Sequence, residues 1–317
     1  MAAIERLDDS SWQRVLCVVA HPDDLEYGTS AAVAAWTQRG VEVSYLLLTS
    51  GEAGMQRPPH EVGPLRAAEQ RTACQHVGVN DLTILDFPDG MLEYSLDLRR
   101  AIARVVRQRK PDAVVTALWD VEAYGGLNQA DHRAAGLAAV DGVRDADNTW
   151  VFPELAADEG LPKWHTKAIL VAGHPDATHG VEVSETDVKA SVASLQAHAA
   201  YLADLPGHPA PAEFIPQIST GGGEALGTEY AVTFRVRPRR ARGRLAPLSG
   251  SSLRCRARRR LAPLSGSSLR CRVVGAGGLV GAGRLDKPLL DVLDAQSPVD
   301  RRQCLQQPPG VLAGQTI

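Results

Sequence analysis

The sequence predicts an α/β fold of the Rossmann-like type, with a mostly parallel sheet and helices on both of its faces. Two observations predict it. Several short runs are apolar at every position, which is typical of strands buried on both faces. Stretches of roughly 12 residues with helical spacing separate these runs, as in repeated β-α-β units. Ligands of such folds bind beyond the carboxyl ends of the strands, so we expect the chemistry in the loops that follow them.

The first part of the chain contains three predicted strands and two predicted helices. Residues 15–20 (VLCVVA) and 41–49 (VEVSYLLLT) are apolar runs of strand length, and 82–85 is a short run before the turn sequence FPDG. The alanine-rich residues 28–39 predict a helix between the first two strands. Residues 63–77 have helical spacing and predict a second helix before the third strand.

The same alternation continues to about residue 200. A helical stretch ends at Lys110-Pro111, because proline cannot continue a helix. A buried strand, AVVTAL, follows it. The predicted elements of this half are helix 96–108, strand 113–118, helix 132–143, strand 168–172 and helix 187–203.

Charge divides the chain of 317 residues into two parts. Residues 1–240 carry a net charge of −12, whereas residues 241–317 carry +9. The basic part contains RLAPLSGSSLRCR twice, at 244–256 and 260–272, and has no aromatic residue. We therefore predict one α/β domain over 1–240 and an Arg-rich tail over 241–317 that is disordered or poorly packed. Without aromatic residues among the arginines, we do not expect the tail to bind nucleic acid.

Three features predict a soluble protein of the cytoplasm. No apolar run reaches the roughly 18 residues that a membrane span needs. The first fourteen residues lack the basic start and apolar run of a secretory signal. The five cysteines show no CxxC spacing, so neither a disulfide framework nor a structural zinc site is expected.

The loop after the first predicted strand reads AHPDDLE and carries the strongest chemical signal. His21 and Asp24 are three residues apart, so that a tight turn can point both side chains at one centre. Imidazole and carboxylate are common zinc ligands. Asp23 would then lie beside the metal, where a general base can take a proton from water.

This loop also has a simpler interpretation. Asp23 or Asp24 can cap the helix that begins near Thr29. The metal interpretation needs a third ligand, and the loop after strand 113–118 supplies His132 at the start of a helix. Two histidines and one aspartate leave a coordination position for water, as a catalytic site requires.

Together these loops resemble the PIG-L/LmbE family of zinc-dependent N-acetylglucosaminyl deacetylases. The likeness rests on AHPDD after the first strand and covers about residues 14–236. The further matching segments, in order, are LLLTSGEAG, the RxxE helix at 66–69, LDFPDG at 85–90, ADHRAAG at 130–136, the helix around VKASVASLQAHAAY and the closing strand at 229–236.

The resemblance implies a role for each matching residue. It makes His21, Asp24 and His132 the ligands of zinc, with iron(II) as the alternative metal, and Asp23 the general base. Arg66 and Asp89 match positions that hold sugar hydroxyls. Asp131 matches a carboxylate that orients a neighbouring catalytic histidine. The implied reaction is removal of an acetyl group from a small amino-sugar substrate by metal-activated water.

One position departs from the family pattern. The chain has Gln129-Ala130-Asp131-His132 where most members have His-x-x-His. A glutamine amide can donate a hydrogen bond to an oxyanion but cannot shuttle a proton. His198, on the predicted helix 187–203, is a candidate substitute, although a surface or capping histidine is the simpler interpretation. The departure keeps two alternatives open, which are an amidase for thiol conjugates and a non-catalytic zinc- or sugar-binding relative.

Three other motifs are expected to carry no chemistry. A second HPD at 174–176 lacks a following carboxylate and predicts a loop. The segment GAGGLVGAG at 275–283 resembles a dinucleotide turn but has no paired β-α-β unit, so a flexible linker is predicted. Residues 221–223 (GGG) also predict a loop.

Overall fold

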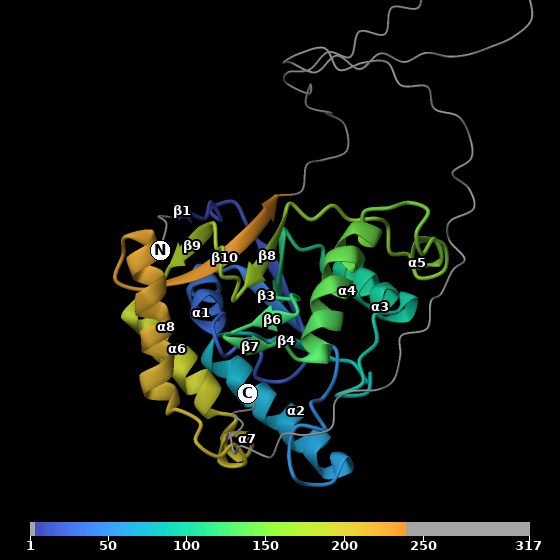
Figure 1. Ribbon diagram of the computed structural model, residues 1–317. Helices are drawn as coiled ribbons and strands as arrows, with labels where there is room; N and C mark the ends of the chain where they lie inside the picture. Colours follow the sequence, from blue (N-terminus) through green and yellow to red (C-terminus); the bar gives the residue numbers. More distant parts are fainter. Residues whose placement is uncertain (1–3, 239–317) are drawn as a thin grey trace, which may run out of the picture. The chain divides into compact units, whose positions relative to one another are not determined.

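The computed structural model describes residues 4–238, so the predictions for the tail, its repeat and the segment at 275–283 lie outside the described residues. These residues form a Rossmann-like α/β unit, as the sequence predicts (Figure 1). Its sheet has the strand order β1-β9-β10-β8-β5-β2-β3-β4. The strands are β1 (Glu5–Arg6), β2 (Arg14–Val19), β3 (Glu42–Leu47), β4 (Asp81–Ile84), β5 (Ala113–Ala117), β8 (Ala168–Ala172), β9 (His179–Glu182) and β10 (Ala231–Pro238).

Five neighbouring strands, from β8 through β4, run parallel, while β10 runs antiparallel to both of its neighbours. After β2 the chain moves outward through β3 to β4, then returns to build β5 on the other side of β2. The loops that follow β2 and β5 therefore diverge at a topological switch point, where open α/β sheets bind their ligands.

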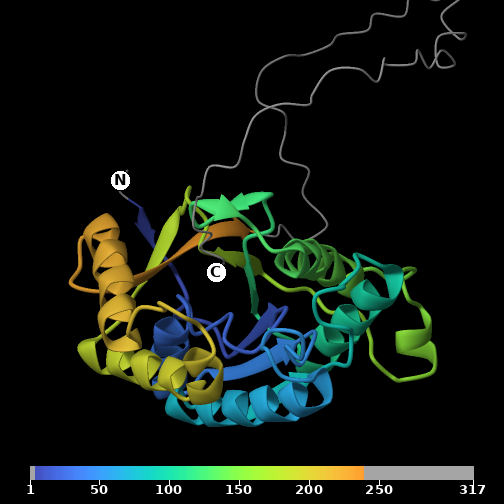
Figure 2. The ribbon, with the colours of Figure 1, turned by 60° about the horizontal axis from the view of Figure 1, so that its bottom comes forward.

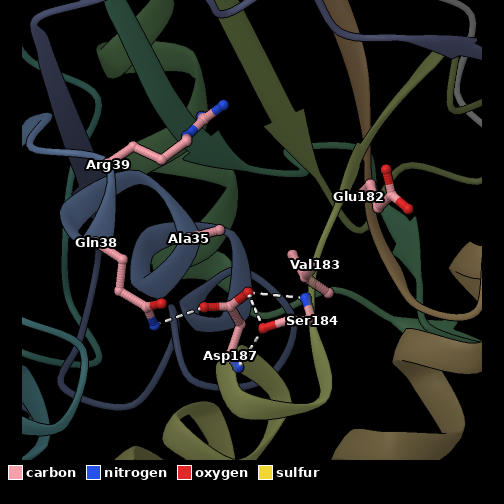
Figure 3. A pocket seen from close by; sticks show the side chains of 7 residues that line it. All are labelled: Ala35, Gln38, Arg39, Glu182, Val183, Ser184 and Asp187. Atoms are coloured by element: carbon pink, nitrogen blue, oxygen red, sulfur yellow. Dashed lines mark hydrogen bonds between the residues drawn. The ribbon is translucent and has the colours of Figure 1, made fainter.

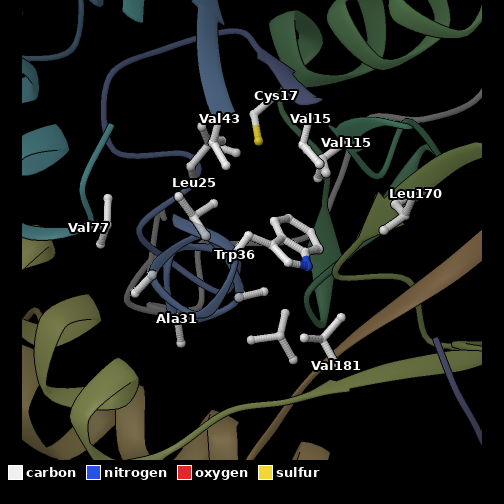
Figure 4. Close-up of a cluster of buried hydrophobic side chains, with 14 of the residues drawn as sticks. Val15, Cys17, Leu25, Ala31, Trp36, Val43, Val77, Val115, Leu170 and Val181 are labelled. Atoms are coloured by element: carbon white, nitrogen blue, oxygen red, sulfur yellow. The ribbon is translucent and has the colours of Figure 1, made fainter. Parts of the chain in front are cut away.

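The helices cover both faces of the sheet (Figure 2). One face carries α1 (Ser30–Gln38), α2 (Pro59–His76), α6 (Glu185–Gln196) and α8 (Pro211–Leu226), and the other carries α3 (Leu96–Arg109) and α4 (Ala130–Ala146). The strand β2 shows why the sheet needs both layers. Its alternate residues Val15 and Cys17 enter the core beneath α1 (Figure 4). Val19 belongs to the same cluster, whereas Leu16 and Val18 pack under α3 and α4.

The remaining described elements are small. The antiparallel pair β6 (Glu122–Ala123) and β7 (Gly126–Leu127) lies between β5 and α4, and α5 (Glu154–Ala157) and α7 (Ala199–Ala203) are short helices. None of the helices within 4–238 is long and apolar enough to cross a membrane. Cys17 and Cys74 are buried free thiols. The cytoplasmic location stays a prediction.

The prediction of one helix over 187–203 was wrong. The structure has α6 and α7 there, with a bend at His198, whose φ and ψ are −81° and 47°. The bend places the backbone N–H of Ala200 2.6 Å from Oε1 of Glu69 on α2. The acceptor for the first turn of α7 therefore comes from another helix, which periodicity along the chain cannot reveal.

The loop predicted at 221–223 was also wrong, because these glycines lie inside α8. Glycine is unfavourable in a helix, but here it permits close packing. A Cβ on Gly222 would lie 2.1 Å from the carbonyl oxygen of Ala231, and one on Gly223 would lie 2.3 Å from that of Glu229. The helix thus approaches the backbone at the start of β10 more closely than any side chain allows.

We predict that Gly222→Ala lowers the free energy of unfolding by about 1–3 kcal/mol, because backbone must move to admit the methyl group. Gly221→Ala is the matched control, since a Cβ there meets nothing within 4 Å. It should be neutral or stabilise by up to about 1 kcal/mol through helix propensity. Urea unfolding of both variants measures the difference, and equal stabilities would contradict the packing argument.

Candidate metal centre

The loop after β2 holds Asp24 with one oxygen turned to the backbone and the other to the site. Oδ2 accepts the backbone N–H groups of Ala20 and His21, each at 3.0 Å. Oδ1 lies 3.0 Å from Nε2 of His132 and 3.6 Å from Nδ1 of His21. The N-cap residue of α1 is Thr29, which makes no side-chain cap bond. The capping interpretation of Asp24 is therefore not supported, because its acceptor faces the strand end.

His132 enters the site from the first turn of α4, and a neighbour fixes its tautomer. The amide Nδ2 of Asn128 donates to the carbonyls of Leu118 and Asp120, which leaves its Oδ1 as an acceptor. This oxygen lies 3.2 Å from Nδ1 of His132. Nδ1 must then carry the proton, and Nε2 presents its lone pair towards Asp24.

His21 is oriented by carboxylates in the same way. Its Nε2 lies 3.0 Å from Oδ1 of Asp89 and 3.4 Å from Oδ2 of Asp131. Both carboxylates are themselves fixed by backbone donors, Asp89 by the N–H of Ala53 and Asp131 by those of Gly90 and Leu92. A proton on Nε2 satisfies this contact and leaves Nδ1 of His21 free to face Asp24.

Three donor atoms thus converge, namely Nδ1 of His21, Oδ1 of Asp24 and Nε2 of His132. The ligand atoms that this triad offers lie within 4.8 Å of one another. Two imidazole nitrogens and a carboxylate oxygen suit Zn²⁺, and the same set suits Fe²⁺. The orienting partners complete the fit, because histidine ligands usually donate their second N–H to a carboxylate or carbonyl. The residues present therefore fit a divalent cation.

The electrostatics of the triad point the same way. Burial alone would raise the pKa of Asp24, but the imidazoles of His132 and His21 hold it well below its usual range. Burial opposes a charge on His21, yet Asp24, Asp131 and Asp89 raise its pKa well above the ordinary value. Burial likewise opposes a charge on His132, whose pKa Asp24 raises. The pocket of carboxylates stabilises positive charge at its centre, which a cation supplies.

Asp23 lies beside the triad in a strained conformation. Its φ of 84° is in the left-handed region, which residues other than glycine seldom adopt. Its carboxylate oxygen Oδ1 accepts a hydrogen bond from Nη2 of Arg66, with 2.5 Å between the two atoms. Burial raises the pKa of Asp23 to about 6, against the lowering effect of the Arg66 guanidinium. A carboxyl group with a pKa near neutrality can both accept and return a proton.

Arg66 is only 2% exposed and contacts the loop rather than solvent. Besides Asp23, it donates to the carbonyl oxygens of Pro22 at 2.7 Å and Gly51 at 3.0 Å. The ring of Tyr201 covers the guanidinium, with 3.9 Å between its centroid and Cζ of Arg66. The RxxE segment thus connects the loop after β2 to α7, since Glu69 accepts from Ala200.

The residue that departs from the family pattern takes no part in these contacts. Gln129 is exposed and is the N-cap residue of α4, without a side-chain cap bond. The proposed substitute, His198, is fully buried, so the expectation of a surface histidine was wrong, and it occupies the N-cap position of α7 without a side-chain cap bond. Its ring lies 3.9 Å from Oε2 of Glu26, and neither ring nitrogen has a hydrogen-bond partner. Burial lowers the pKa of His198 to about 3.

Asp131 and the two predicted sugar-binding residues have protein partners as well. Asp131 lies against a histidine of the site, with 3.4 Å between its Oδ2 and Nε2 of His21, and its role in orienting a catalytic histidine stays a prediction. Sequence reasoning missed Asn128, Gln70 and Glu26. For Glu26 the available signal was a third acidic residue two positions after HPDD, whereas a glutamine or asparagine gives no signal without knowledge of its neighbours.

Two hollows away from the triad are visible in the described part of the chain. The one in Figure 3 lies between α1 and the start of α6. Three of its polar side chains bond to one another, because Gln38 donates to Asp187, which forms a capping box with Ser184. The other is lined mainly by α2 and the end of β4.

The second HPD, at 174–176, lies in the loop between β8 and β9, as predicted. These places show no comparable convergence of ligand atoms.

The sequence is similar to a protein family and to several known proteins. The model of the PIG-L family, described as GlcNAc-PI de-N-acetylase, matches residues 16–143. A 1D-myo-inositol 2-acetamido-2-deoxy-alpha-D-glucopyranoside deacetylase of Kineococcus radiotolerans is 32% identical, over 63% of this chain and 71% of its own length. A probable N-acetyl-alpha-D-glucosaminyl L-malate deacetylase 2 of Bacillus anthracis is 30% identical, over 60% of this chain and 82% of its own.

A diacetylchitobiose deacetylase of Thermococcus kodakarensis is 30% identical, and the chain spans 58% of its length. Among solved structures, the N,N'-diacetylchitobiose deacetylase of Pyrococcus horikoshii has the same fold, with a TM-score of 0.65 at 22% identity over 73% of this chain and 85% of that one. The matches define the class as the α/β fold that these deacetylases share. The chain belongs to the PIG-L family.

We predict that the purified protein binds one equivalent of Zn²⁺ and that His132→Ala abolishes binding at micromolar metal, because it removes a donor from the triad. Asn128→Leu should bind about 10- to 100-fold more weakly, since the tautomer of His132 is no longer fixed. Isothermal titration after chelator treatment measures both. His165→Ala, away from the triad, is the control. Unaltered affinity in His132→Ala would contradict the ligand assignment.

We also predict that His198 makes the native state sensitive to acid. Its pKa is about 3 when folded and 6.5 in the unperturbed state. As pH falls below 6.5, the unfolded chain takes up the proton before the folded chain does. The free energy of unfolding therefore falls by up to about 1.4 kcal/mol per pH unit.

Urea unfolding at pH 7 and pH 5 tests this prediction. Between pH 7 and pH 5, the free energy of unfolding of the wild type should fall by about 2 kcal/mol more than that of His198→Gln. His76→Gln, at an exposed position of α2, should behave like the wild type. An equal acid loss in His198→Gln would show that His198 is protonated in the folded protein.

Proposed function

We propose that the protein is a metal-dependent hydrolase that removes the acetyl group from an N-acetylglucosaminyl substrate and releases acetate and an amino sugar. The observation that carries this proposal is the convergence of His21, Asp24 and His132 beside a buried carboxyl, Asp23. The names of the relatives support the substrate class, because those reported above are deacetylases of acetylated amino sugars.

His21, Asp24 and His132 would hold the cation, with zinc as the proposed metal and iron(II) as the alternative. A divalent cation in such a site lowers the pKa of water and polarises an amide carbonyl. Asp89 and Asn128 keep the imidazoles in the tautomers that this role needs, by holding the proton on the nitrogen that faces away from Asp24.

Asp23 is the proposed general base and acid. Its pKa of about 6 leaves it mostly ionised at neutral pH, ready to accept a proton from the attacking water. The same carboxyl can return that proton to the amine that leaves. Arg66 holds Oδ1 of Asp23, so that the other oxygen is the one available for proton transfer.

The sugar-binding role implied by the family falls on two side chains that already have partners within the chain. Arg66 and Asp89 are the proposed ligands of the sugar hydroxyls, and both also contact the loop or His21. Gln129 is the proposed oxyanion donor in place of histidine. Loss of such a group typically costs about 10²- to 10³-fold in rate, so slow turnover is expected.

The fold alone does not fix the reaction. The structure of a 4-carboxy-2-hydroxymuconate hydratase from Pseudomonas putida has a TM-score of 0.59 with this chain at 17% identity. An amidase for thiol conjugates would use the same metal core, and a relative without turnover is the second alternative that Gln129 motivates. The assay below therefore includes N-acetylglucosaminyl inositol, diacetylchitobiose and a thiol conjugate.

We predict acetate release from an N-acetylglucosaminyl substrate that chelator abolishes and Zn²⁺ restores. Asp23→Asn should keep the metal and lose about 10²- to 10⁴-fold in kcat, because the amide cannot accept the proton. Asparagine also tolerates the positive φ of this position, so the fold is preserved. Metal analysis and acetate assay measure the two properties.

The control is Asp86→Asn, a carboxylate of the loop after β4 that contacts none of the triad. Full activity in Asp23→Asn would remove Asp23 from the mechanism. Metal binding without release of acetate from any substrate would identify a binding protein, and release from the thiol conjugate alone would identify the amidase.

A further inference from the structure

Asp23 is held in place by more than its partner Arg66. A positive φ at a residue other than glycine persists only where the surroundings impose it. The backbone N–H of Asp23 donates to Oε1 of Gln70 at 3.0 Å. Gln70 is 1% exposed and lies four residues after Arg66 on α2, so both project from one face of this helix.

The orientation of the Gln70 amide is itself determined by a second buried group. Its Nε2 donates to Oε1 of Glu26 at 3.0 Å, and Glu26 has no exposed surface. The hydroxyl of Ser194 on α6 donates to the same carboxylate oxygen at 3.3 Å. With its nitrogen directed at Glu26, the amide can present only its oxygen to Asp23.

Asp23 is therefore held by two contacts with separate tasks. Arg66 binds its carboxylate and the carbonyl of Pro22, whereas Gln70 binds its backbone N–H. Glu26 also donates its backbone N–H to the carbonyl oxygen of Asp23 at 2.9 Å, which closes a turn. The side chain and the peptide groups on both sides of Asp23 thus have fixed partners.

We propose that Gln70 is a positioning residue that holds the Asp23 carboxyl at the metal centre, with Glu26 fixing the direction of its amide. The proposal rests on the function proposed for Asp23. Gln70 touches none of the ligand triad, and it acts through the backbone of Asp23 alone. Its loss should move the carboxyl, and a displacement of about 1 Å can cost about 10²-fold in rate.

Gln70→Glu tests this idea because the new side chain keeps an acceptor for the N–H of Asp23 but loses the amide donor to Glu26, so that two buried carboxyl groups meet and must repel or share one proton. The double variant Glu26→Gln/Gln70→Glu exchanges the two groups. A glutamine at position 26 then donates to a glutamate at position 70, whose oxygen still accepts from Asp23. Gln75→Glu, on the exposed face of α2, is the control for charge.

For the metal-loaded protein we expect Gln70→Glu to lose about 10²-fold in kcat with little change in KM or metal content. The exchange variant should recover most of this loss, and Gln75→Glu should equal the wild type. In the Asp23→Asn background, Gln70→Glu should lower kcat hardly any further, because the carboxyl group that Gln70 positions is absent. An equal loss in both backgrounds, or no loss in either, would overturn the proposal.

Crystal structures of the same variants give a readout that does not need activity. Asp23 should leave its positive φ in Gln70→Glu and return to it in the exchange variant. An unmoved Asp23 in Gln70→Glu would overturn the positioning role even if turnover fell. If the wild type released no acetate, the proposed function would fail, and the crystal structures would still decide whether Gln70 holds this loop.

Discussion

The carboxylate of Asp24 is the contact on which the site depends. It lies between two imidazoles, His21 from the loop after β2 and His132 from the first turn of α4. The sheet makes this possible. Because β5 is built beside β2 only after the chain has left for β3 and β4, residues 108 positions apart in the sequence meet at one edge.

The layer behind the ligands consists of buried polar groups that have few alternatives. Each imidazole is fixed by an acceptor, Asn128 or Asp89, and these are fixed in turn by backbone groups. Such networks are costly unless their members are satisfied, because water cannot replace a missing partner. Contacts within the folded chain therefore direct the donor atoms of the triad at one centre.

A second polar cluster lies beneath Asp23, the proposed general base, and fewer of its polar atoms have hydrogen-bond partners. Burial raises the pKa of Glu26 to about 7, and Oε2 of Glu26 has no hydrogen-bond partner. The ring of His198 beside it is likewise unpartnered, and burial favours its neutral form. Buried polar groups without partners lower the free energy of unfolding. Their position directly behind Asp23 is typical of functional sites, where proteins retain locally unfavourable groups.

The sequence by itself determined the sheet, most helices and the triad, because these follow from local patterns. Apolar runs define buried strands, and HPDD after a strand with DH at the start of a later helix places His21, Asp24 and His132 at one sheet edge. The tertiary structure alone decided the rest. The kink at His198, the glycines inside α8 and the partners of Asp23 and His21 depend on contacts between distant segments. Periodicity describes how a chain repeats along itself, whereas burial and hydrogen bonding at a given residue depend on which other elements pack against it.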